Sequence, residues 1–585
     1  MSFKKSLITL GIISIIGSLS ACGGGGSSST PDTPAPPPPS PPSNSAPTGV
    51  TLSNTSVDEN TAGATVGDIT VADPDAGDTH TLSVDGDIFT INGTTLQLLD
   101  GVMLDADSGT TAVDAVITAT DADGESVVST ISVSINDLMD RYTFDSKTND
   151  GESAVSYSGQ IARHTLIAEL NYYINNGLQD DLDNGVLNDR EAVLAKLNTY
   201  FRTTVLEYAD LPITFLAEAE QNLLADISGS HKTLVSKIAG NDATGQHKDW
   251  LNGDFVGWGD QTITPEGLVD ALFGMLADNA EAYLNGAVRQ DFEGNTITRV
   301  YINEDGKDLK QLIQKFLLMS VTYSQGTDDY FGSDTEGKGL LTDNETAASA
   351  GSNYTNLEHQ FDEGFGYFGA AVNYLEYSDV EIAGKVNDSQ GRVGWNGMQD
   401  TDGNGVINLL SEYNWGQSVN ASKRDLGSAD NAAATDFSKQ ALEAFTAGRA
   451  LINDNVGTDL AGDQFTQLEE YVAKGVDAWE RAIVATVVHY INDTNADLAK
   501  IGTADFSFAD LAKHYSEMKA FALGIQFNER SQLSDADFAT LHQLIGTAPA
   551  FADATAISSY QADLLQARDI LQQAYNFDAE NVANW

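Results

Sequence analysis

The spacing of apolar residues changes once along this chain, near residue 140, and the change separates two classes of fold. Between residues 48 and 139, short runs alternate apolar and polar residues and are divided by turns rich in Asp and Gly. Alternation with a period of two is typical of half-buried β-strands, so we expect a small β-sandwich of about seven strands. The expected strands include Val50–Leu52, Gly67–Val71, Thr95–Leu99, Ala115–Thr120 and Ser129–Ile135.

From residue 140 to residue 585 apolar residues recur at intervals of three and four, which predicts an all-α domain of about ten helices. None of these segments is apolar enough to span a membrane. The clearest are Ile161–Ile174, Arg190–Val205, Glu266–Ala282, Leu309–Val321, Asn356–Leu375, Asp436–Ile452, Phe465–Ile491, Phe508–Ile525 and Ala556–Tyr575. A faint similarity between residues 312–323 and 479–490 indicates two related helical bundles. The predicted fold is therefore multidomain, a small all-β sandwich followed by a large all-α domain.

The N-terminus predicts export and a lipid anchor. Lys4 and Lys5 precede an apolar run, and the segment ends Leu19-Ser20-Ala21-Cys22. We interpret residues 1–22 as a lipoprotein signal peptide, cut before a diacylated Cys22. Because Cys22 is the only cysteine, no internal disulfide can form. The alternative is an ordinary signal peptide with an incidental cysteine.

Residues 23–47 are almost entirely Gly, Ser and Pro, so they predict an extended tether that carries the domains away from the membrane. Gly23 after the cysteine resembles the pattern of outer-membrane lipoproteins of Gram-negative bacteria. That resemblance implies a periplasmic or surface location at the outer membrane.

The net charge excludes one class of partner. With 85 acidic against 30 basic residues, the formal charge is -55. Such a surface repels phosphates, so we expect no binding to nucleic acid or to anionic lipid headgroups. Cations are the natural partners, although the same charge also serves solubility in a salty habitat.

Five short acidic motifs in the β region occur in the order found in cadherins and bacterial cadherin-like repeats. They are Val57-Asp58-Glu59-Asn60, Ala72-Asp73-Pro74-Asp75, Leu104-Asp105-Ala106-Asp107, Thr120-Asp121-Ala122-Asp123-Gly124 and Ile135-Asn136-Asp137. The resemblance implies Ca²⁺ binding, which suits clustered carboxylates. By motif, one group of ligands should face the helical domain: Glu59, Asp105, Asp107, Asn136 and Asp137. Asp73, Asp75 and Asp121 should lie at the tether-side end. The alternative is a sandwich whose carboxylates are only solvated.

A second candidate calcium loop lies in the helical region. Residues 400–408, Asp-Thr-Asp-Gly-Asn-Gly-Val-Ile-Asn, match the first nine positions of an EF-hand or dockerin-type loop. The predicted ligands are Asp400, Asp402, Asn404, Val406 and Asn408, with Gly405 at the sharp turn. The twelfth position is Ser411, and the nearest carboxylate, Glu412, comes one residue late. A plain Asp/Asn/Gly turn is the alternative.

Two helical segments pair a histidine with a glutamate. His359 and Glu363 are four residues apart, and His514 and Glu517 are three apart, so each pair shares one helix face. If the two bundles face each other, these four residues could bind iron or zinc inside the helical domain. The alternative is that both histidines are buried and hydrogen-bonded to neighbouring carboxylates.

The helical region resembles the lipoprotein family called domain of unknown function 4856, near the imelysin-like proteins. The matching residues are Ser156–Arg163, His359–Gly369, Tyr413–Gly416, Ala421–Arg424 and His514–Glu517. Imelysin-like proteins are periplasmic or surface-exposed, and their His-x-x-Glu motif is linked to iron uptake or to peptidase activity. The resemblance implies a similar role for His514 and Glu517.

Three functions follow as hypotheses. The first is a non-enzymatic, calcium-binding envelope lipoprotein whose helical domain binds a metal or metal-bearing ligand. The second is a calcium-dependent adhesion protein with a partner on a neighbouring cell or in the matrix. The third is a metallopeptidase-like enzyme, with Glu363 or Glu517 as general base. No His-Glu-x-x-His, Gly-x-Ser-x-Gly or phosphate-loop motif occurs in the sequence, so the enzymatic hypothesis is the least favoured.

Overall fold

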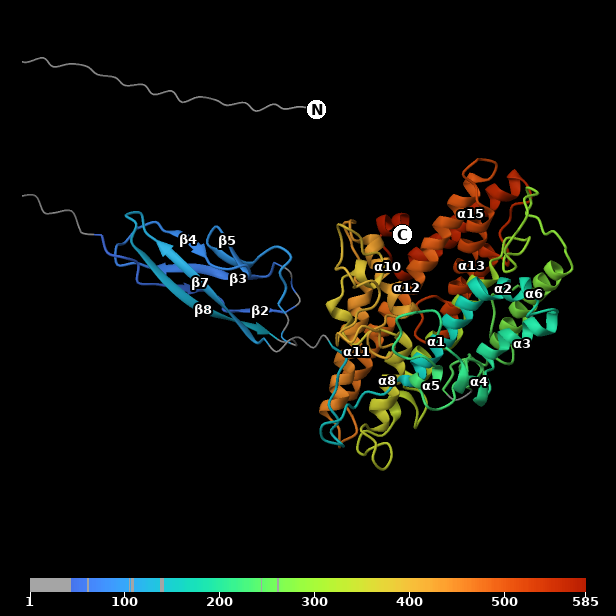
Figure 1. The fold of residues 1–585 in the computed structure, drawn as a ribbon, viewed down its shortest axis with the longest axis horizontal. Helices are drawn as coiled ribbons and strands as arrows, with labels where there is room; N and C mark the ends of the chain where they lie inside the picture. The colour runs from blue at the N-terminus through green and yellow to red at the C-terminus, as the bar shows by residue number, and fades with distance from the viewer. Residues whose placement is uncertain are drawn as a thin grey trace, which may run out of the picture. The chain divides into compact units, whose positions relative to one another are not determined.

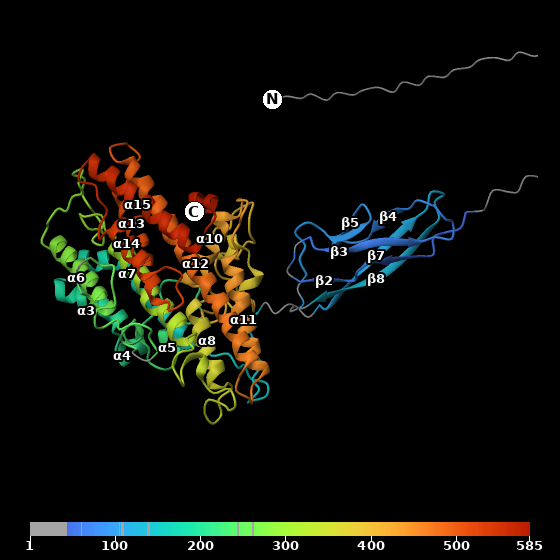
Figure 2. The same cartoon turned by 180° about the vertical axis from the view of Figure 1, so that it is seen from behind.

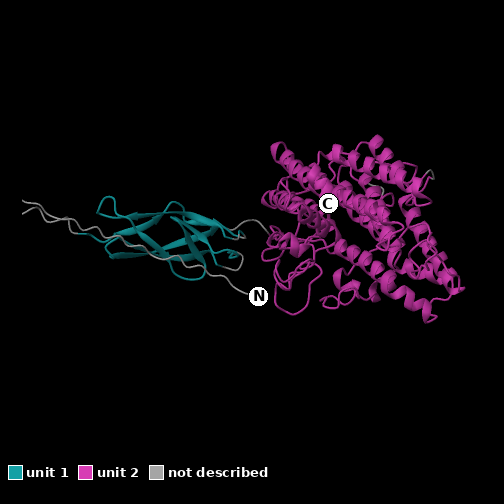
Figure 3. Cartoon of the chain, turned by 90° about the horizontal axis from the view of Figure 1, so that it is seen from above, with its two compact units in different colours: residues 1–137 teal, residues 138–585 magenta. Residues whose placement is uncertain are grey.

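The chain forms two compact units in the computed structural model, residues 1–137 and 138–585 (Figure 3). The structure describes residues 44–585 except 60, 62, 105, 107–109, 137–140, 243–244 and 260–261. The predicted signal peptide, Cys22 and most of the tether therefore lie outside the described residues, as do Asp105, Asp107 and Asp137. Each unit has its own hydrophobic core, which confirms the multidomain β-plus-α class.

The first unit is a β-sandwich of two four-stranded sheets, with strand orders β1-β3-β6-β5 and β2-β8-β7-β4 (Figure 1). Its strands are β1 (Gly49–Leu52), β2 (Ser56–Asp58), β3 (Thr65–Ala72), β4 (Thr81–Val84), β5 (Phe89–Asn92), β6 (Thr95–Leu98), β7 (Ala112–Thr120) and β8 (Ser126–Asn136). The five expected runs lie in β1, β3, β6, β7 and β8, except that Leu99 follows the end of β6. All pairings are antiparallel except that of β2 with β8.

Alternation builds the core of the sandwich as predicted. Every second residue near the middle of β7 is buried, and Ala115, Ile117 and Ala119 have no exposed surface. Leu96 and Leu98 of β6 are equally buried on the other sheet. The residues between them, Val116, Thr118 and Gln97, are partly exposed on the outer faces of the sheets.

The second unit is helical. Its α-helices are α1 (Ser158–Tyr172), α2 (Leu178–Asp183), α3 (Arg190–Phe201), α4 (Val205–Asp210), α5 (Leu224–Ile227), α6 (Pro265–Leu284), α7 (Leu309–Leu317), α8 (Asn356–Phe368), α9 (Asp379–Ile382), α10 (Gly416–Ser428), α11 (Phe437–Asp454), α12 (Asp463–Lys500), α13 (Phe508–Gly524), α14 (Asp535–Ile545), α15 (Ala554–Tyr575) and α16 (Ala579–Asn584). Within the described residues, no helix combines the length and apolar character needed to cross a membrane.

The 38-residue helix α12 organises this unit. It packs against α10, α11, α13 and α15, and α11 lies beside it in both views of the ribbon (Figures 1 and 2). Trp479, Val484 and Val487 of α12 have no exposed surface. The helices share one continuous core and form one compact unit. The relation between two bundles, expected from residues 312–323 and 479–490, stays a prediction.

Several expected helices differ from the structure at their ends, and two of them show a clear physical reason. The helix expected over Asn356–Leu375 ends at Phe368, because Gly369 takes a left-handed conformation (φ +73°) and its N–H donates to the carbonyl of Phe365. The helix expected over Leu309–Val321 is α-helical only to Leu317. It continues as two π-helical segments, Leu318–Tyr323 and Gln325–Tyr330. Both segments are fully buried, so tertiary packing supports this wider backbone.

Candidate calcium sites and buried polar centres

The loop at residues 400–412 folds around the carboxylate of Asp400. One carboxylate oxygen accepts the N–H of Gly403 (2.7 Å) and of Asn404 (3.1 Å), and the other accepts that of Gly405 (2.8 Å). These hydrogen bonds, led by that from Gly405, hold the pKa of Asp400 below its usual value. Gly405 has φ +88°, the left-handed conformation that the sharp turn requires.

Glu412 completes the loop although it stands one residue beyond the twelfth position. Its side chain is buried, with its two oxygens accepting the backbone N–H groups of Thr401 (2.6 Å) and Asn408 (2.8 Å). One oxygen each from Asp400, Asp402 and Glu412 lie within 4.8 Å of one another. The structure thus brings a third carboxylate to the predicted loop.

The loop is anchored to the rest of the unit through Ile407. This buried residue donates its N–H to the carbonyl of Glu218 (2.7 Å) and accepts the N–H of Glu220 (2.8 Å). The side-chain oxygen of Asn408 accepts from Leu410 N–H (2.9 Å) and from the amide of Gln221 (3.3 Å). The loop is therefore held on one side while Asp402 and Asn404 stay exposed.

In the β unit, the tether-side group of predicted ligands comes together with one addition. One carboxylate oxygen each from Asp73, Asp75 and Asp78 lie within 4.8 Å of one another. Asp78 was missed because no cadherin-like motif marks it. Loss of hydration and the charges of Asp73 and Asp75 raise the pKa of Asp78. His80 Nε2 lies 2.9 Å from Asp73, and this hydrogen bond lowers the pKa of Asp73.

Asp121 joins the same end of the sandwich. Its Oδ1 accepts the backbone N–H groups of Asp123 (3.0 Å), Gly124 (2.8 Å) and Glu125 (2.9 Å), while Oδ2 accepts from Asn44 (2.9 Å). These hydrogen bonds, that from Asn44 first, lower the pKa of Asp121. Asp121 also interacts electrostatically with Asp73 and Asp78.

At the other end of the sandwich, Glu59 is fully buried and accepts the N–H of Ala106 (2.6 Å). The side-chain amide of Asn136 donates to Asp58 (2.9 Å), and the backbone carbonyl of Asn136 accepts the N–H of Glu59 (3.2 Å). Glu59 and Asn136 therefore lie at the same end of the sandwich. Their expected companions Asp105, Asp107 and Asp137 fall outside the described residues.

The histidine and glutamate pairs of the helical unit are not brought together. The ring of His359 stacks on Tyr354, its Nδ1 lies 3.1 Å from the carbonyl of Ser156, and Glu363 accepts from Gln160 (2.8 Å). His514 instead faces α12, with Nδ1 2.7 Å from Asp497. In the part of the chain that the structure describes, these four residues form no group of three possible metal ligands. The four-residue iron or zinc site stays a prediction, and in the described residues each pair contacts its own neighbours.

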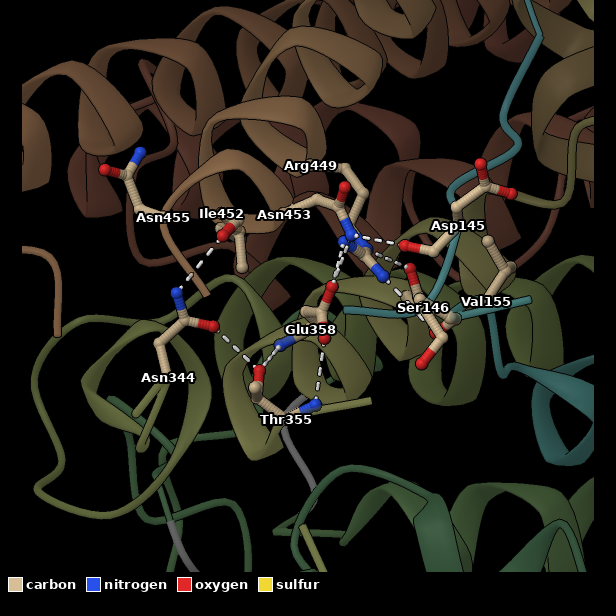
Figure 4. Close-up of polar contacts among 12 residues, drawn as sticks. Asp145, Ser146, Val155, Asn344, Thr355, Glu358, Arg449, Ile452, Asn453 and Asn455 are labelled. Atoms are coloured by element: carbon tan, nitrogen blue, oxygen red, sulfur yellow. Dashed lines mark hydrogen bonds and ion pairs between the residues drawn. The ribbon is translucent and has the colours of Figure 1, made fainter. Parts of the chain in front are cut away.

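Glu358 and Asp362 of α8, two further acids near His359, surround the fully buried Arg449 of α11. Arg449 lies 2.9 Å from Glu358 and 2.7 Å from Asp362, and all three side chains have no exposed surface. Asn453 also donates to Glu358 (2.9 Å) and to the carbonyl of Asp145 (3.0 Å). In Figure 4, one carboxylate oxygen of Glu358 accepts from Arg449 and Asn453, and the other accepts from the N–H of Thr355. This centre fixes α8 on α11 and offers no open position to a ligand.

Comparison with known proteins covers part of the helical unit. No curated protein sequence matches the chain. A family model described as "Domain of unknown function (DUF4856)" matches residues 140–379, from before α1 to the start of α9.

Proposed function

We propose that this protein is a calcium-binding, non-enzymatic lipoprotein of the cell envelope, in which Ca²⁺ binds the loop at residues 400–412. The observation that carries the proposal is the convergence of Asp400, Asp402 and Glu412 on one point. Ca²⁺ takes six to eight oxygen ligands, and carboxylates that approach this closely repel one another unless a cation lies between them.

The loop offers enough oxygen for such a site. Besides the three carboxylates, it carries the side-chain oxygens of Asn404 and Asn408 and the backbone carbonyl of Val406. These are the ligand types that EF-hand-like loops use. Bound Ca²⁺ would neutralise the three carboxylates. It would also stabilise the loop, which Ile407 joins to residues 218–220 and which leads into α10.

The cluster of Asp73, Asp75, Asp78 and Asp121 supports a second calcium site and the adhesion hypothesis. A lone cadherin-like repeat supplies half of an inter-repeat site, so a β unit of another molecule could complete it. Calcium-dependent clumping of cells that display the protein, abolished by Asp73→Ala, would support adhesion. Clumping that persists with a chelator would count against it.

Location at the outer membrane rests on the lipobox that ends in Cys22 and on the resemblance to imelysin-like proteins, which are periplasmic or surface-exposed. Metabolic labelling with a radioactive fatty acid tests the anchor. Label on the native protein and none on Cys22→Ala is the expected result. Equal label on both proteins would contradict it.

Calorimetric titration of calcium-free protein, residues 23–585, tests the proposed function. We expect saturable Ca²⁺ binding, and a ligand at 100 times its dissociation constant stabilises the folded state by about 2.7 kcal/mol. The variant Asp400→Asn, Glu412→Gln should lose one site, while Asp388→Asn, an exposed acid outside the cluster, should keep it. Asp73→Asn, Asp75→Asn separates the contribution of the β unit. Native titration curves from the Asp400, Glu412 variant would refute calcium binding by the loop.

A further inference from the structure

A cavity of about 750 Å³ lies in the helical unit, and none of its lining residues belongs to the sites described above. Three segments form it: residues 336–343, the first part of α8, and residues 459–465, which lead into α12. Small-molecule sites in proteins typically measure about 300 to 1,000 Å³. The cavity therefore has the size of a binding site for a small ligand.

The floor of the cavity is apolar. Leu340 and Leu357 are each 2% exposed and belong to the core of the unit, and Leu460 is also buried. Phe465, in the first turn of α12, adds a partly exposed aromatic ring. This apolar floor favours a ligand with hydrocarbon surface, and the ring can also contact a cation.

The charged residues of the lining are all acidic. They are Glu336, Asp343 and Asp459, and no lysine, arginine or histidine lines the cavity. The one lysine between residues 336 and 343, Lys338, lies 3.2 Å from the buried carboxylate of Asp329. The charge of Lys338 is therefore compensated elsewhere, and the cavity attracts cations and repels anions.

Hydrogen bonds hold two of these carboxylates in place. The carboxylate of Asp343 accepts the hydroxyl of Thr346 (2.6 Å) and the N–H of Glu345 (2.9 Å). These hydrogen bonds, that from Thr346 first, lower the pKa of Asp343, so its side chain stays charged. Asp459 accepts the backbone N–H of Asn344 (3.0 Å), the residue after Asp343. None of these donors carries a positive charge, so both carboxylates remain available to a cation.

The three carboxylates do not meet at one point. Among the described residues, the acidic groups whose oxygens lie within 4.8 Å of one another include the loop at residues 400–412 but not these three side chains. A single Ca²⁺ requires six to eight oxygens close together. A ligand whose positive charges are spaced along an apolar chain matches both the separated carboxylates and the apolar floor.

We propose that this cavity binds an aliphatic polyamine. Its ammonium groups would pair with Glu336, Asp343 and Asp459 through charge-assisted hydrogen bonds, and its methylene groups would pack on the apolar floor. This site is separate from the calcium loop, and the ligand differs in kind, because recognition needs hydrocarbon as well as charge.

Calorimetric titration of the calcium-free chain, residues 23–585, with spermidine at an ionic strength of about 0.15 M tests the proposal. We expect one equivalent to bind saturably. The double variant Glu336→Gln, Asp459→Asn removes two ion pairs and should weaken binding about tenfold. Leu341→Ser, at a partly exposed position of the lining, should weaken binding a few-fold without any change in charge. The control Asp388→Asn, Asp430→Asn removes two exposed charges outside the cavity and should leave the affinity unchanged.

A competition with Mg²⁺ separates polyamine recognition from attraction by charge alone, because Mg²⁺ carries charge without hydrocarbon. The proposal is overturned by the absence of saturable spermidine binding, by an equal loss of affinity in the two double variants, or by displacement of spermidine by an equal concentration of Mg²⁺. Tryptophan fluorescence verifies that each variant is folded, and the exposed Glu336→Gln alone keeps the test decisive if the double variant does not fold. The calcium titration depends on other carboxylates, so either proposal can fail alone.

Discussion

Replacing Arg449 with methionine should destabilise the helical unit far more than replacing a surface arginine. The substitution keeps most of the side-chain volume and removes the charge from the centre that Figure 4 shows. Glu358 and Asp362 then remain fully buried without a cation. The guanidinium contacts with the carbonyl of Ala154 and the ring of Phe144 are lost as well.

The expected loss of stability depends on the two buried carboxylates that remain after the substitution. Glu358 keeps donors from Thr355 and Asn453, and Asp362 keeps those from Tyr142 (3.0 Å) and Ser156 (2.9 Å). Hydrogen bonds alone do not compensate two buried negative charges. Removing one partner of a buried ion pair typically costs about 3 to 5 kcal/mol, and we expect Arg449→Met to fall in that range.

Urea denaturation followed by tryptophan fluorescence measures the effect in one unit only. All six tryptophans lie between residues 250 and 585, so the β unit does not contribute to the signal. Arg202→Met is the matched control, because Arg202 also contacts two carboxylates, Glu266 (2.6 Å) and Asp270 (2.8 Å), but is 30% exposed. Exposed ion pairs contribute about 0 to 1 kcal/mol.

A loss below about 1.5 kcal/mol in Arg449→Met, or equal losses in the two variants, would refute this reasoning about buried charge. The triple variant Glu358→Gln, Asp362→Asn, Arg449→Met gives a second check. Since it removes the stranded charges too, it should be more stable than Arg449→Met alone.

Two further predictions concern other buried groups. Burial lowers the pKa of Lys519 to about 7 against about 10.4 in the unfolded chain, so the unfolded state binds more protons between these values and stability should rise with pH there. Lys519→Met should lower the slope of the free energy of unfolding against pH by up to about 1.4 kcal/mol per pH unit. Urea denaturation at pH 7.5, 8.5 and 9.5 measures this slope, and equal slopes for the native protein and the variant would contradict the prediction. Glu480→Gln should cost about 2 to 3 kcal/mol, because the buried carboxylate accepts from Tyr323, Asn528, Gln532 and Tyr575 and an amide has only one accepting oxygen. The exposed Glu443→Gln is its control in the same denaturation experiment, and an equal loss in both would refute the role of these hydrogen bonds.

The β unit was predictable because its signal is local. A half-buried strand alternates residue by residue, so Ala115, Ile117 and Ala119 mark their own burial. The expected runs did not include β2, β4 or β5. The long helices were predictable for the same reason. Helix α10 was not, because its buried face includes Gln417, Ser418 and Arg424, which read as polar surface.

Among the candidate sites too, those whose residues are close together in sequence are easier to predict than those that only the fold brings together. The loop at residues 400–408 was recognisable because its candidate ligands lie within nine residues of sequence. The hypothesis that joined His359 with His514 needed two distant helices to meet, which spacing within each helix cannot show. Arg449 was missed altogether, since nothing near it in sequence marks it as the partner of Glu358. A local pattern places residues on a helix face but does not say what that face meets.

The match to the family of unknown function ends at residue 379, but the folded unit does not. Inside the matched segment, α8 places Phe368 against Phe445 and Trp479, with ring centroids 5.6 and 5.3 Å apart, and both partners lie beyond residue 379. Glu358 of α8 depends on Arg449 in the same way. A segment that ended at residue 379 would expose these aromatic faces and leave two buried carboxylates without a cation. The second half of the helical unit is therefore part of the same fold, and it carries the proposed calcium loop.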